Sequence, residues 1–126
     1  MSLQKLLKQA KSAVYVTPSN YRIDSPIQIN QPYLRLYLMP GTRIYVMGSS
    51  LFLSDTSIQQ YIKIWGGEII FGQNATGIWG NDTPANFVLE DVVIDPANNG
   101  QWDNSTIGTG TQCYYVYNRQ TGELLS

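Results

Sequence analysis

Histidine is absent from the 126-residue chain, and Cys113 is its only cysteine. Without an imidazole there can be no Ser-His-Asp or Cys-His catalytic site and no histidine-ligated zinc. A single cysteine cannot form an intrachain disulfide or a cysteine-based metal cluster. The sequence therefore excludes these nucleophilic and zinc-dependent chemistries, and we expect neither a metal nor another cofactor.

Charge is also scarce, because Asp, Glu, Lys and Arg make up only 13% of the residues. Lys5, Lys8 and Lys11 lie in the first eleven residues with no acid among them, so the remainder has a net negative charge. We therefore expect no nucleic-acid binding by the body of the protein. The chain has no run of about 18 apolar residues that would span a membrane. Its N-terminus also shows no apolar segment typical of a secretory signal peptide.

Residues 2–12 have the pattern of an amphipathic helix. Leu3, Leu6, Leu7 and Ala10 follow one another at helical spacing on one face, and the three lysines lie on the other. We predict that this helix covers one end of the core. The alternative is a basic helix lying on a membrane surface, which is less favoured because the segment lacks aromatic anchors.

From Ala13 onward the chain consists of short β-branched and aromatic runs, most of them ending at a Pro, Gly, Asn or Asp turn. Two series of apolar residues recur every 24 to 28 positions: Leu36, Ile64, Leu89 and Val116, and Ile44, Ile70 and Ile94. A repeat of this length made only of short strands predicts a solenoid whose turns pair in parallel, about 4.8 Å apart. Two-residue hairpin signals are scarce in the first half, which disfavours a sandwich.

We expect one domain over residues 1–126, with a capping helix at 2–12. The main turns of the coil are predicted at 13–95, and a last turn with a C-terminal strand-turn cap at 96–126. Ile29 and Ile64 are expected to point into the core.

Four segments carry a family resemblance: VYVTPSNYRIDSPIQI (14–29), YLRLYLMPGTRIYV (33–46), YIKIWGGEIIF (61–71) and FVLEDVVID (87–95). Their order after a helix resembles right-handed parallel β-helix proteins of the pectate-lyase-like and phage tailspike group. The resemblance implies an all-β fold: a right-handed, single-stranded parallel β-helix of about four to five short rungs with an N-terminal amphipathic capping helix. Ser19 departs from the glycine usual in that family. No polygalacturonase or calcium-dependent lyase motif is present, so the resemblance implies the fold and not the catalysis.

For catalysis we assign no residue. Glycoside hydrolysis needs two carboxylates about 5 Å or about 6.5–9.5 Å apart. The candidates are Glu68, Asp82, Glu90, Asp91 and Asp95, of which Glu68 could pair with Glu90, and Glu68 and Asp82 are the two we retain. Ligand binding is the stronger expectation. Trp79 lies beside Asn81 and Asp82, and Trp102 lies beside Asp103. A Trp ring can stack on a sugar ring while neighbouring amide and carboxylate groups bond to its hydroxyls. The alternative is that such a Trp packs in the core of the coil.

These observations favour a non-enzymatic viral or surface structural protein, in which a small β-helix serves assembly or attachment to a glycan or host. The alternative is a small carbohydrate-active enzyme, a polysaccharide lyase or glycoside hydrolase, using Asp or Glu. Expected partners are a glycan or other cell-surface ligand and further copies of this chain or other virion proteins, with neither nucleic acid nor membrane. The expected location is a virion or an extracellular surface.

Overall fold

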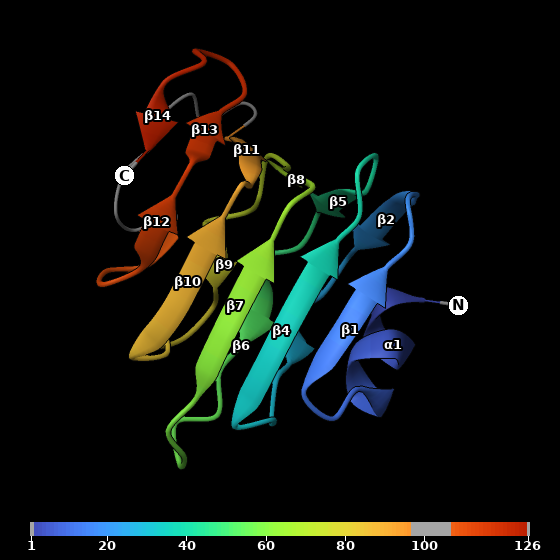
Figure 1. Cartoon of the computed structure of the whole chain (residues 1–126), viewed down its shortest axis with the longest axis vertical. Coiled ribbons are helices and arrows are strands. Elements are labelled where there is room, and N and C mark those ends of the chain that lie inside the picture. The colour runs from blue at the N-terminus through green and yellow to red at the C-terminus, as the bar shows by residue number, and fades with distance from the viewer. Residues whose placement is uncertain (1, 97–106, 126) are drawn as a thin grey trace.

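The computed structural model describes residues 2–96 and 107–125. They form a short helix, α1 (Leu3–Gln9), followed by a β-solenoid of about four turns (Figure 1). Sheet A contains, in spatial order, β1 (Ala13–Val16), β4 (Tyr33–Leu38), β7 (Tyr61–Trp65), β10 (Asn86–Glu90) and β12 (Gln112–Tyr114). Sheet B contains β2 (Asn20–Ile23), β5 (Arg43–Val46), β8 (Glu68–Phe71), β11 (Val93–Asp95), β13 (Val116–Asn118) and β14 (Leu124–Leu125). Sheet C contains β3 (Ile27–Gln28), β6 (Ser50–Leu53) and β9 (Gly77–Trp79).

Successive turns of the coil place their strands side by side, so neighbouring strands in a sheet are far apart in the sequence. All pairings among the described strands are parallel except that of β14, which returns antiparallel to β13. The predicted parallel coil is confirmed. Burial alternates along the longer strands of sheets A and B, so every second side chain there points inward. Ile64 in β7 and Ile29 just after β3 are both buried, as expected.

Stacked side chains from successive turns build the core, and the predicted series are nearly correct. Leu36 aligns with Ile64, and Ile64 with Leu89, but the next residue is Cys113 and not Val116. The last apolar run turns a corner at Tyr115, whose φ is +56°, so Val116 already belongs to sheet B.

The second series contains a shift of one residue. Ile69, and not Ile70, aligns with Ile44 and Ile94. The strand after the Gly-Gly turn begins at Glu68, which points outward, and alternation then turns Ile69 inward and Ile70 outward.

Helix α1 covers the N-terminal end of the coil, as predicted, with Leu3 and Leu7 buried in the common core. Ser2 is the N-cap and accepts a hydrogen bond from the Lys5 backbone N–H at 3.2 Å. The helix ends at Gln9, short of the predicted residue 12, because Ala10 is extended. No helix in the described part of the chain is long and apolar enough to cross a membrane.

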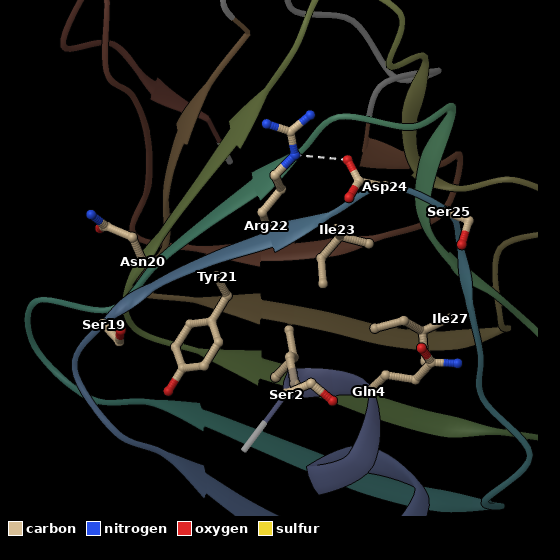
Figure 2. A pocket seen from close by; sticks show the side chains of 11 residues that line it. Ser2, Gln4, Ser19, Asn20, Tyr21, Arg22, Ile23, Asp24, Ser25 and Ile27 are labelled. Carbon is tan, nitrogen blue, oxygen red and sulfur yellow. Dashed lines mark hydrogen bonds and ion pairs between the residues drawn. The ribbon is translucent and has the colours of Figure 1, made fainter.

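The cap leaves a hollow of about 480 Å³ between α1 and β2, the edge strand of sheet B. Figure 2 shows Tyr21 and Ile23 on the side facing Ser2. It shows Arg22 and Asp24 on the opposite side, where they form an ion pair of 2.8 Å. Both charged side chains are well exposed, so this pair contributes little to stability.

Gln60 is a buried polar residue that holds three backbone groups at the bend before β7. Its Nε2 donates to the carbonyls of Ile29 (2.9 Å) and Gln31 (3.1 Å), and its Oε1 accepts from the Asp55 N–H at 2.8 Å. We expect Gln60→Leu to lower the free energy of unfolding by about 2 kcal/mol or more, because it removes three hydrogen bonds to buried and part-buried backbone groups. Urea denaturation measures this loss. The matched control is Gln59→Leu at the exposed neighbouring position, and an equal loss there would contradict the role of Gln60.

Candidate functional site

Trp79, the first ligand candidate from the sequence, packs inside the coil. Its ring lies 5.3 Å from the Phe52 ring and 5.2 Å from the Phe87 ring, and only 8% of the residue is exposed. Its Nε1–H has no hydrogen-bond acceptor within the described residues. This placement favours the alternative that Trp79 fills the coil.

Asn81 and Asp82 lie at the bend after β9. The Asn81 side chain is used by the preceding turn of the coil: its Oδ1 accepts from the Ser54 N–H at 2.7 Å, and its Nδ2 donates to the Ser54 carbonyl at 2.9 Å. Asp82 contributes its backbone carbonyl to the same contact, accepting from the Ser54 hydroxyl, and is itself exposed. Trp102 and Asp103 lie outside the described residues.

Glu68, the other carboxylate considered for catalysis, lies on sheet B and not beside Asp82. Its Oε2 is 3.2 Å from Arg43 Nε and 3.5 Å from Arg119 Nη1, and Arg119 also approaches Asp95 at 3.7 Å. The Glu68 Oε2 atom is buried without a hydrogen bond of good geometry, so these contacts are ion pairs. A carboxylate held between Arg43 on β5 and Arg119 after β13 ties turns of the coil together.

The thiol and the acidic groups form no evident reactive centre in the described residues. Burial raises the pKa of the Cys113 thiol, which disfavours the nucleophilic thiolate. No group of three or more Cys, Asp or Glu residues in the ranges 2–96 and 107–125 is arranged to hold a metal ion.

The outer face of sheet A is the most distinctive surface of the molecule. The strand register arranges its outward side chains in three rows that run across successive turns. The first row is Tyr33, Tyr61 and Asn86; the central row is Ala13, Arg35, Lys63, Val88 and Gln112; the third row is Tyr15, Tyr37, Trp65, Glu90 and Tyr114. Two aromatic rows thus flank a central row that contains two cations.

A groove of about 800 Å³ follows the central row; we call it the sheet A groove. It is lined by Ser12, Ala13, Tyr15, Tyr33, Leu34, Arg35, Tyr37, Tyr61, Ile62, Lys63, Asn86, Val88 and Gln112. Three of its tyrosines are well exposed, from 40% at Tyr61 to 67% at Tyr15, and Tyr37 is half-buried. A contiguous patch of exposed aromatic side chains is typical of a binding surface.

The aromatic rings in these rows stack on each other instead of lying flat on the sheet. Tyr15 and Tyr37 have ring centroids 4.8 Å apart and planes within 16°, and Tyr33 and Tyr61 are 5.0 Å apart and within 10°. The ring faces that meet are therefore covered, so each pair offers a ligand its ring edges, its hydroxyl groups and its outer faces. Sugar rings could stack at the ends of the rows, where the aromatic series stops and Asn86 follows Tyr61 in register.

The sequence contained the signal for this surface, although we selected tryptophans in turns as the ligand candidates. Tyr15, Tyr37 and Trp65 occupy matching positions in successive strands, as do Tyr33 and Tyr61. In a parallel coil, strand alternation directs the side chains at these positions away from the core. Aromatic residues at outward positions of consecutive repeats are thus the pattern that finds the groove.

Comparisons with protein-family models, with curated proteins and with solved structures gave no significant match. The β-solenoid fold and the geometry of the sheet A groove are thus the basis for assigning a function.

Proposed function

We propose that this chain is a non-enzymatic attachment module that binds a glycan in the sheet A groove. In this proposal it is a short relative of the pectate-lyase-like and tailspike β-helix proteins and acts on a virion or an extracellular surface. Assembly with further copies or with other virion proteins would present several grooves at once, which raises avidity without any new contact. Support for the family relationship comes from the capped parallel coil and the order of its sequence segments.

The single observation that carries the proposal is the pair of exposed aromatic rows beside the groove. Phenolic hydroxyls both donate and accept hydrogen bonds, and they stand at regular intervals along the groove. A saccharide carries hydroxyls at comparable short intervals, so a row of tyrosines suits a chain of sugars. Stacking fixes each ring before binding, which lowers the entropy lost when a ligand orders the side chains.

The non-enzymatic part of the proposal is supported by the positions of the carboxylates. No Asp or Glu lines the sheet A groove. Glu90, in the third row, is paired with Lys63 at 3.2 Å. Neither Glu68 nor Asp82 lies on this face, so a ligand in the groove meets no pair of carboxylates set for acid-base work.

Replacing Tyr61 with alanine should weaken glycan binding about tenfold or more, because it removes a ring from the middle of the groove and frees its partner Tyr33. A glycan array identifies the bound saccharides, and calorimetric titration of the best of them measures the dissociation constant. The matched control is Tyr117→Ala. Tyr117 lies on sheet B and has nearly the same exposure, 39% against 40% for Tyr61.

Binding of no glycan by the purified protein, or equal weakening by the two variants, would contradict the assignment of the groove. Cleavage of the bound saccharide by the unaltered protein would contradict its non-enzymatic character.

A further inference from the structure

Arg35 is the uncompensated cation of the sheet A groove. It lies in the central row, in register between Ala13 and Lys63, and its side chain is exposed. Within the described residues no carboxylate or carbonyl accepts from its guanidinium, whereas Lys63 is already paired with Glu90. A guanidinium presents a planar fork of donors that matches a carboxylate or another oxyanion.

The rings on either side of Arg35 add to the same preference. Because Tyr15 stacks on Tyr37 and Tyr33 stacks on Tyr61, one face of each ring is covered and the ring edges become a larger part of what the pair offers a ligand. The edge of an aromatic ring is the positive part of its quadrupole, and the phenolic O–H adds a hydrogen-bond donor. Both groups favour ligand atoms with negative charge.

The charge of the groove differs in sign from that of the whole chain. Its lining contains the cations of Arg35 and Lys63 and no acidic residue, although the protein has a net charge of −1. A local positive field over polar and aromatic groups attracts an anion and repels a cation.

We propose that the groove selects an acidic saccharide, whose carboxylate or sulfate group contacts Arg35 while its hydroxyls bond to the tyrosines. This inference rests on the proposed glycan-binding function and adds the charge of the ligand. The anion replaces water around a guanidinium that has no internal partner, so its contact with Arg35 does not require an existing ion pair to break.

The experiment compares acidic oligosaccharides with their neutral counterparts: a uronic-acid oligosaccharide with its carboxyl-reduced form, and a sulfated oligosaccharide with its desulfated form. Titration of the unaltered protein should give at least about tenfold tighter binding for one acidic member of these pairs. Arg35→Gln should remove most of that preference, because it weakens binding of the acidic member far more than binding of the neutral member. Arg22→Gln removes the same charge from the exposed β2 strand outside the groove and should keep the preference.

Equal affinity for acidic and neutral members would overturn this inference while leaving the glycan-binding function in place, and so would an undiminished preference in Arg35→Gln. Loss of the preference in Arg22→Gln as well would show that overall charge, and not the groove, selects the ligand, which also overturns it. Failure of every saccharide to bind would overturn both proposals. Circular dichroism of both variants establishes that they remain folded.

Discussion

An aspartate in place of Ile69 should abolish cooperative folding, whereas the same replacement one residue later, at Ile70, should leave the protein folded. Ile69 is fully buried, in register between Ile44 and Ile94. The substitution removes a buried branched side chain, at a cost of about 2–5 kcal/mol for truncation alone, and leaves a buried carboxyl group without a partner. Domains of this kind are stable by only about 5–15 kcal/mol, so the total cost is comparable to the whole stability.

Ile70 is the matched control because it has the same side chain, lies in the same strand and points outward. Thermal unfolding followed by circular dichroism distinguishes the two variants: Ile70→Asp should keep a sigmoidal transition and Ile69→Asp should show none. Cooperative unfolding of Ile69→Asp with a midpoint near that of the unaltered protein would contradict the inward direction assigned to this residue.

The second large effect is expected at Gly66, at the corner between sheets A and B. Its φ is +81°, and a Cβ added there would lie 2.5 Å from the carbonyl oxygen of Leu38 in the preceding turn. That oxygen belongs to the backbone and cannot rotate away. Gly66→Ala should therefore lower the free energy of unfolding by about 3 kcal/mol or more, combining left-handed strain with a displaced turn of the coil.

Gly122 separates these two causes. Its φ is +75°, close to that of Gly66, but no atom lies within 4 Å of a Cβ built on it. Gly122→Ala should thus cost only the conformational strain, about 1–2 kcal/mol. Urea denaturation of both variants measures the difference, and equal losses would show that the close approach to Leu38 is relieved without cost.

Much of the fold could be predicted from the sequence because each turn of a coil needs inward apolar residues at matching positions. The spacing of Leu36, Ile64 and Leu89 identified stacked turns, and the leucine stripe of residues 2–12 identified the cap. The errors fell at corners. A run such as Tyr114–Tyr117 looks like one strand, and only the left-handed backbone at Tyr115 divides it between two sheets.

Sheet C was the part of the fold that the sequence pattern predicted least well. Its strands are short, and Gly77–Trp79 lies in a stretch rich in glycine and asparagine, which shows no alternating strand pattern. The same stretch led to the selection of Trp79. Sequence proximity to Asn81 and Asp82 suggested a site, but burial of the indole depends on Phe52 and Phe87, which are distant in the sequence.

The stacked coil also sets how the chain must fold. Aligned core residues on adjacent turns are separated by similar lengths, 22 residues from Val14 to Leu36 and 28 from Leu36 to Ile64. The entropy of closing such a loop varies slowly with its length, so each new turn is about as costly to add as the one before it. The first pair of turns must form without an already folded turn to pack against, so we expect its formation to be the slow step. The coil can then grow toward both ends. Folding of this molecule is thus expected to resemble a zipper nucleated once, with the last turns to form also being the first to fray.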